Sequence, residues 1–214
     1  MWIKICGIRS MQDAEVVSRF QPAAIGLNFY QKSPRSVTRE LAREIIRNIP
    51  EPIERVGVFV DQTPAEIAEI ANELILTHVQ LHGNYLPEHL VALKKHSIIW
   101  VYRMGREGLT PLLSQLDSLQ QNQISVTACL IDARVPGLYG GSGQTVDWES
   151  LVREYDQEKL PKLILAGGLV PENIAEAISV VNPWGVDVAS GVERDDRKDA
   201  HLIEQFLMNA TSAV

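Results

Sequence analysis

The sequence alternates eight times between a short run rich in β-branched residues and a longer segment with helical apolar spacing. The predicted strands are residues 2–6, 23–28, 55–60, 78–82, 98–103, 127–132, 162–166 and 184–189. Strands separated by helices pair in parallel. Eight such units in 214 residues predict an α/β protein, a (β/α)8 TIM barrel formed by a single domain over residues 1–214. A doubly wound open sheet is the alternative, but its dinucleotide-binding glycine cluster is missing after the first strand.

Helix starts are marked by capping residues. Ser10 and Thr38 each precede a helical pattern, and Thr63-Pro64-Ala65-Glu66 is a capping box with proline at the first helical position. The predicted helices cover residues 11–20, 39–48, 64–74, 84–95, 110–121, 148–155 and 171–181, and a last helix begins near residue 199.

Composition and charge narrow the function classes. The formal charge of -7 comes without clusters of Lys and Arg, so a nucleic-acid partner is not expected. Two cysteines do not make a disulfide framework and favour a reducing compartment. The chain begins without a secretory signal and has no run of about 18 apolar residues, so we expect no membrane partner and a cytoplasmic location.

The active site of such a barrel lies at the carboxyl ends of the strands. Cys6, His82, Asp132 and Asp187 lie at or near those ends. Side chains two positions apart share a face of a strand, so Lys4 accompanies Cys6 into the barrel. A buried lysine needs a counter-charge, which predicts that Lys4 lies beside Asp132 or Asp187. We also expect the Lys4 ammonium to favour a Cys6 thiolate, because a nearby cation lowers a thiol pKa.

Each of these residues also has a purely structural interpretation. Cys6 is either a small buried side chain or a base, and Asp132 either caps a loop or acts as a general acid. His82 is either structural or part of the site. Arg35 is either a solvated loop residue or a bidentate carboxylate ligand. Cys129, in the middle of an apolar strand, is interpreted as core.

Glycine-rich loops follow three consecutive strands. They are Gly140-Gly141-Ser142-Gly143 after the sixth, Gly167-Gly168 after the seventh and Ser190-Gly191 after the eighth. Glycines let backbone N–H groups approach an anion, and the last two loops are a frequent phosphate site in this fold. The sequence therefore predicts a phosphate-bearing small-molecule ligand, with residues 133–146 as a lid. The five histidines lack the spacing of metal ligands, so no metal site is expected.

Several of these segments occur together in one known family. Lys4-Ile5-Cys6-Gly7, Ser33-Pro34-Arg35, Val79-Gln80-Leu81-His82-Gly83, Ala166-Gly167-Gly168-Leu169 and Asp187-Val188-Ala189-Ser190-Gly191-Val192-Glu193 appear in that order. On these motifs the chain resembles phosphoribosylanthranilate isomerase of tryptophan biosynthesis. Residues 193–199 depart from the family pattern, because they lack its usual Pro-Gly.

The resemblance implies an Amadori rearrangement without a cofactor, from N-(5-phosphoribosyl)anthranilate to 1-(2-carboxyphenylamino)-1-deoxyribulose 5-phosphate. It implies Cys6 as general base, Asp132 as general acid and Arg35 as the ligand of the anthranilate carboxylate. His82 and Asp187 would line the site. The phosphate would be bound by the glycine loops, which contain Gly141, Ser142, Gly167, Gly168, Ser190 and Gly191. Members occur as monomers and homodimers. The alternative is a phosphate-binding barrel that is inactive or acts on another phosphorylated metabolite.

Overall fold

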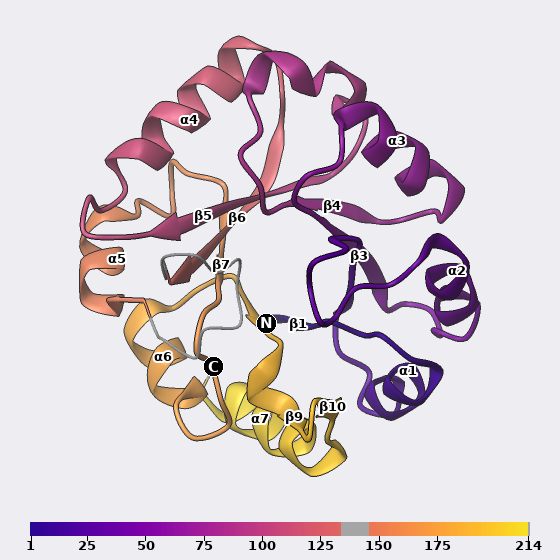
Figure 1. Ribbon diagram of the computed structural model, residues 1–214. Coiled ribbons are helices and arrows are strands. Elements are labelled where there is room, and N and C mark those ends of the chain that lie inside the picture. The colour runs from indigo at the N-terminus through magenta and orange to yellow at the C-terminus, as the bar shows by residue number, and fades with distance from the viewer. Residues whose placement is uncertain (134–145, 214) are drawn as a thin grey trace.

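Eight parallel strands close into a barrel in the computed structural model, which describes residues 1–133 and 146–213. The strands are β1 (Trp2–Cys6), β2 (Ala24–Asn28), β3 (Glu54–Phe59), β4 (His78–Leu81), β5 (Ile98–Met104), β6 (Val126–Ala133), β7 (Lys162–Leu165) and β8 (Gly185–Val188). Each pairs with the next in sequence, and β8 returns to pair with β1. Figure 1 looks along the barrel, with the helices forming an outer ring. The predicted (β/α)8 architecture is confirmed.

A helical segment follows every strand. These segments are α1 (Met11–Ser18), α2 (Arg39–Arg47), α3 (Pro64–Glu73), the 3₁₀ helix η1 (Pro87–Leu93), α4 (Thr110–Gln121), α5 (Trp148–Glu154), α6 (Ile174–Val181) and α7 (Ala200–Ser212). The predicted caps at Ser10, Thr38 and Thr63 are confirmed, since each side chain accepts a hydrogen bond from a backbone N–H of the first turn. None of the helices in the described ranges has the length and apolarity that a bilayer crossing requires.

Two helical segments differ from the sequence prediction. The helix after β4 is η1, a 3₁₀ helix without a side-chain cap. Its buried residues Leu90 and Leu93 are three apart, which suits a helix of three residues per turn. The helix after β7 begins at Ile174 instead of residue 171. The delay arises because the Asn173 side chain bonds back to Gly168 and Val170 and holds the preceding residues in a turn.

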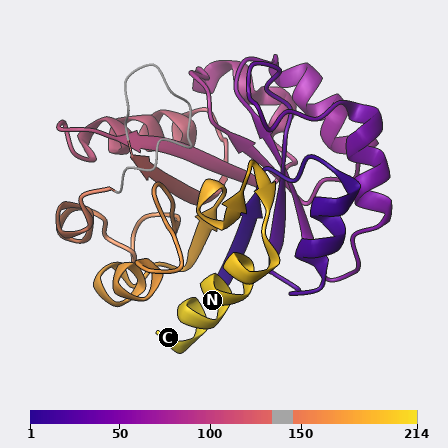
Figure 2. The ribbon, with the colours of Figure 1, turned by 60° about the horizontal axis from the view of Figure 1, so that its bottom comes forward.

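A short hairpin was not predicted. After β8 the chain forms the 3₁₀ turn η2 (Ser190–Val192), then β9 (Glu193–Arg194) and β10 (Arg197–Lys198), paired antiparallel. Asp195 and Asp196 form the two-residue turn, both with positive φ (49° and 60°), as tight hairpin turns require. Asp195 and Asp196 thus lie within residues 193–199, the segment where the family's usual Pro-Gly is missing. The hairpin packs against α1, which brings the last barrel unit against the first (Figure 2).

The barrel interior is apolar at its amino end and polar at its carboxyl end. Its apolar cluster contains Trp2, Ala24, Val56, Ile99, Val101, Ala128, Leu130, Ile164 and Ala166. Trp2 stacks on Trp184 with ring centroids 5.3 Å apart. Two residues beyond Trp2 on the same face of β1 lies Lys4, which is fully buried, and Gln80 and Asp132 are buried as well. This polar layer forms the floor of the site.

Candidate active site

One pocket opens at the carboxyl ends of the strands and gathers the predicted site residues of the described chain. It is lined by Cys6, Gly7, Asn28, Ser33, Arg35, Val58, Gln80, His82, Leu130, Asp132, Ala166, Gly167, Gly168, Leu169, Asp187, Val188, Ala189, Ser190 and Gly191. Gly141, Ser142 and most of the predicted lid lie in residues 134–145, outside the described residues. Every other residue predicted for catalysis or substrate binding therefore lies around this pocket.

Lys4 forms an ion pair with Asp187 beneath the pocket. The two residues are register partners on β1 and β8, and Lys4 Nζ lies 2.8 Å from Asp187 Oδ1. The prediction of a buried partner for Lys4 is confirmed. Burial alone would lower the pKa of Lys4, but attraction to Asp187 and Cys6 outweighs it and raises that pKa.

Two glycines make room for Cys6 and its neighbour Arg35. A Cβ on Gly26 of β2 would lie 2.6 Å from the Cys6 Sγ. Gly7 has φ +81°, and a Cβ there would lie 2.5 Å from Cδ of Arg35. Sequence reasoning missed Gly26, although a glycine inside an apolar strand signals a close approach of this kind. Both glycines are needed for the thiol and the guanidinium to occupy adjacent positions.

The expectation that Lys4 lowers the pKa of Cys6 is confirmed, but this effect does not decide the net pKa. Burial raises the pKa of the Cys6 thiol above its ordinary value of 9.0, and the charge of Asp187 raises it further. The attraction of Lys4 lowers that pKa but does not compensate for burial. At neutral pH Cys6 is therefore mainly a thiol, and its thiolate is a stronger base than an ordinary one.

His82 and Asp132 lie next to each other on the far side of the pocket. His82 Nε2 is 3.9 Å from Asp132 Oδ2. Burial, then the charges of Arg103 and Lys4, lower the pKa of His82 to about 4, so its imidazole is neutral at physiological pH. Asp132 is 6% exposed. The carboxyl of Asp132 is therefore largely shielded from water at the pocket.

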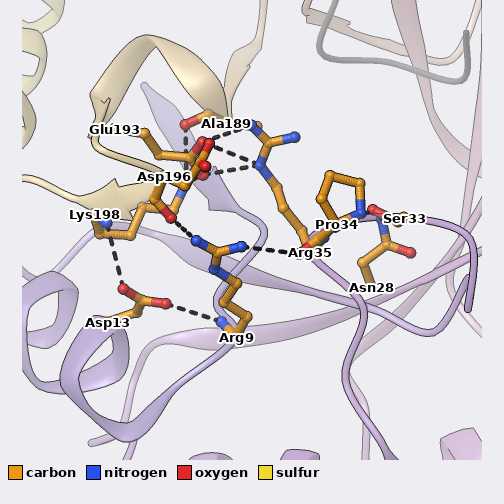
Figure 3. Close-up of polar contacts among 10 residues, drawn as sticks. All are labelled: Arg9, Asp13, Asn28, Ser33, Pro34, Arg35, Ala189, Glu193, Asp196 and Lys198. Atoms are coloured by element: carbon orange, nitrogen blue, oxygen red, sulfur yellow. Dashed lines mark hydrogen bonds and ion pairs between the residues drawn. The ribbon is translucent and has the colours of Figure 1, made fainter.

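Arg35 is held in place by its own loop. Asn28, at the end of β2, donates from Nδ2 to the Ser33 hydroxyl, which also accepts from the backbone N–H of Arg35. The Arg35 side chain forms a bidentate contact with Glu193 of β9 (Figure 3). Arg35 thus binds a carboxylate within the protein itself, that of Glu193, and the sequence did not predict this contact.

The loops after β7 and β8 pack directly on each other. Gly167 and Gly168 have φ values of 83° and 62°, a conformation that favours glycine. A Cβ on Gly191 would lie 1.9 Å from the carbonyl oxygen of Leu169, so a side chain at that position would separate the two loops. Gly167, Gly168, Ser190 and Gly191 all line the pocket, where the sequence predicts the phosphate.

Within the described chain, the pocket has no cluster of metal-ligating side chains. The second cysteine, Cys129, lies in the core. No group of three His, Cys, Asp or Glu side chains lies close enough to hold an ion in residues 1–133 and 146–213. Cys129 is fully buried, and burial raises its pKa to about 12. The prediction that Cys129 is a core residue is confirmed.

Fold and pocket together define an enzyme of the (β/α)8-barrel class. The sequence model of the family described as N-(5'phosphoribosyl)anthranilate (PRA) isomerase matches residues 3–209. The N-(5'-phosphoribosyl)anthranilate isomerase of Trichlorobacter lovleyi is 37% identical over 99% of this chain and 98% of its own. The phosphoribosyl anthranilate isomerase of Thermotoga maritima superposes with a TM-score of 0.83 at 35% identity, over 98% of each chain. The chain belongs to the N-(5'-phosphoribosyl)anthranilate isomerase family.

A further solved relative carries a ligand. It is a phosphoribosyl anthranilate isomerase in complex with reduced 1-(o-carboxyphenylamino)-1-deoxyribulose 5-phosphate. Its TM-score is 0.80 at 32% identity, over 98% of each chain.

The Lys4–Asp187 pair generates a stability prediction. Asp187→Leu leaves the fully buried Lys4 ammonium without its counter-charge, and we expect the free energy of unfolding to fall by about 3 kcal/mol. The double variant Lys4→Met/Asp187→Leu should recover most of the loss, because no charge is then buried. Urea unfolding measures both values.

A surface ion pair supplies the control for this comparison. Asp156 pairs with Lys159 at 2.8 Å, and Lys159 is 81% exposed. We expect Asp156→Leu to change the free energy of unfolding by less than about 1 kcal/mol. Equal losses for Asp187→Leu and the double variant would contradict the assigned role of the buried pair.

The raised Cys6 pKa generates a second prediction. The rate of alkylation of Cys6 by iodoacetamide should increase with pH, with a midpoint above the ordinary value of 9.0, because only the thiolate reacts. Mass spectrometry of digested protein measures the rate, and the fully buried Cys129 serves as the unreactive internal reference. A midpoint below the ordinary value would show that Lys4 dominates over burial.

Proposed function

We propose that this protein converts N-(5-phosphoribosyl)anthranilate to 1-(2-carboxyphenylamino)-1-deoxyribulose 5-phosphate in tryptophan biosynthesis, by an Amadori rearrangement that uses no cofactor. The observation that carries the proposal is that Cys6 of β1 and Asp132 of β6 line one pocket. In the closed barrel β7 and β8 lie between β6 and β1, and the loops after them contain Gly167, Gly168 and Gly191. Family membership supports the same reaction.

Asp132 is the general acid in this proposal. Its carboxyl group gives a proton to the ring oxygen of the ribose, the bond between C1 and that oxygen breaks, and the nitrogen lone pair forms a C1=N Schiff base. Burial of the carboxyl supports this role, because shielding from water favours the protonated form that an acid needs, and the neutral imidazole of His82 adds no charge of its own.

Cys6 is the general base. Its thiolate takes the proton from C2, and the electron pair of the C2–H bond forms a C1=C2 double bond while the iminium nitrogen becomes neutral. The resulting enolamine tautomerises: the C2 hydroxyl loses its proton, C1 gains one, and C2 becomes the ketone. Oxidation at C2 balances reduction at C1, so the step needs no external oxidant. The ammonium of Lys4 supports the thiolate from below.

The two anionic ends of the substrate would bind on either side of this chemistry. Arg35 would hold the anthranilate carboxylate, beside Cys6. The glycine loops would hold the phosphate through Gly167, Gly168, Ser190 and Gly191, joined by Gly141 and Ser142 as the family resemblance implies. A solved relative that binds reduced 1-(o-carboxyphenylamino)-1-deoxyribulose 5-phosphate supports this substrate class. His82 and Asp187 would line the space between the two ends.

Removing either the acid or the base tests the proposal. We expect Cys6→Ser and Asp132→Asn each to reduce turnover of N-(5-phosphoribosyl)anthranilate by at least about 100-fold, the usual scale for a general acid or base. Product formation is followed by chromatography. Cys129→Ala, which removes the other thiol away from the pocket, is the control and should keep turnover within about twofold of wild type. Near-native rates in Cys6→Ser and Asp132→Asn would refute the assigned roles, and no conversion by folded wild type would refute the reaction.

A further inference from the structure

Within the part of the chain that the structure describes, the guanidinium of Arg35 is hydrogen-bonded at one edge. Arg35 Nε lies 2.9 Å and 3.2 Å from the two carboxylate oxygens of Glu193, and Nη2 lies 2.5 Å from Oε2 (Figure 3). A guanidinium has five N–H donors in a planar fork, and this contact uses the edge formed by Nε and Nη2. The edge formed by Nη1 and the second Nη2 hydrogen remains.

That second edge is the part of Arg35 available to a ligand. Among the residues that the structure describes, no hydrogen bond or ion pair is made by Arg35 Nη1, and Figure 3 shows this atom pointing away from Glu193. Arg35 lines the pocket, whereas Glu193 does not. Glu193 therefore lies behind the guanidinium, and the pocket lies before it.

Glu193 is itself fixed by a second cation. Lys198, its register partner on the hairpin, lies with Nζ 2.7 Å from Glu193 Oε1 and donates to the carbonyl oxygen of Ala189 at 2.8 Å. The side chains of Glu193 and Lys198 are 8% and 1% exposed. Burial alone would raise the pKa of Glu193, but hydrogen bonds and attraction from Arg35 and Lys198 lower it, so the carboxylate stays ionised.

The donor geometry of this group suits an incoming carboxylate. Lys198 adds a positive charge beside the Arg35–Glu193 pair, and the carboxylate of Asp196, which also attracts Arg35, offsets it. The attraction for an anion therefore comes from the open N–H edge of Arg35. A planar fork with one open edge matches a carboxylate, which accepts two parallel N–H bonds.

We propose that Glu193, held by Lys198, is a positioning residue for substrate binding: it fixes the plane of the Arg35 guanidinium so that the Nη1/Nη2 edge receives the carboxylate of the substrate. The inference rests on the proposed function and deepens it. The Arg35 stem is already constrained by its contact with Gly7, next to Cys6, so the orientation of the guanidinium is the remaining freedom. Fixing it places the bound carboxylate at a defined distance from the base.

Equilibrium binding tests this without catalysis. Two ligands are compared by calorimetry: reduced 1-(2-carboxyphenylamino)-1-deoxyribulose 5-phosphate and the same compound with a phenyl ring that lacks the carboxylate. Wild type should prefer the carboxylate ligand. We expect Glu193→Gln to weaken binding of the carboxylate ligand by about tenfold and to change binding of the other ligand by less than about twofold.

A double-mutant cycle separates positioning from general structure. If Glu193 acts through Arg35, then Glu193→Gln should have no further effect on carboxylate preference in an Arg35→Ala background. Glu69→Gln is the matched control, because it removes the same type of contact from a surface arginine, Arg39, between α2 and α3. We expect it to leave both affinities unchanged. If Glu193→Gln does not fold, Glu193→Asp replaces it, with an expected loss of at least about threefold in carboxylate preference.

The outcomes distinguish the two proposals. If wild type prefers the carboxylate ligand and a folded Glu193 variant keeps the full preference, the positioning role is refuted while the proposed function stands. Additive losses in the Arg35→Ala background would also refute it. If wild type binds neither ligand or shows no preference for the carboxylate, the substrate assignment fails, and the inference fails with it.

Discussion

The ion pair between Lys4 and Asp187 is the interaction on which the site depends. It joins β1 and β8, the first and last strands of the closed sheet, at the level where the apolar interior gives way to a polar layer. An unpaired ammonium at this depth would cost several kcal/mol, so the carboxylate of Asp187 stabilises the closed barrel as long as Lys4 is charged. The same carboxylate lines the pocket, and the same ammonium lies beneath Cys6. The Lys4–Asp187 pair therefore contributes both to the stability of the closed barrel and to the electrostatic environment of Cys6.

The pocket is surrounded by paired charges. Lys4 with Asp187 forms the floor, and Arg35 with Glu193 and Lys198 forms one wall. Pairing keeps these charged side chains in place, and the open N–H edge of Arg35 suits an anionic group. The proposed substrate carries a phosphate and a carboxylate, and the formal charge of -7 does not oppose the proposal, because binding of such a ligand depends on local groups in the pocket more than on the overall charge.

The sequence predicted most of what depends on local pattern. The positions of strand ends placed Cys6, His82 and Asp132 around one pocket, and burial of Lys4 predicted a partner at Asp132 or Asp187. The expected effect of Lys4 on the Cys6 pKa is confirmed, but the net pKa is raised because it also depends on burial of the thiol, which a sequence does not state. The contact between Arg35 and Glu193 joins residues 158 positions apart through an unpredicted hairpin, and no local pattern contains such a contact.

Loss of the C2 proton is the step that distinguishes Cys6 from any other base. Substrate deuterated at C2 is mixed with excess enzyme, and the deuterium released to water is followed through a single turnover. If Cys6 is the base, wild type releases deuterium as product forms, and folded Cys6→Ala leaves it in the substrate. Release by Cys6→Ala at the wild-type rate would show that another group removes the proton and would contradict the central assignment.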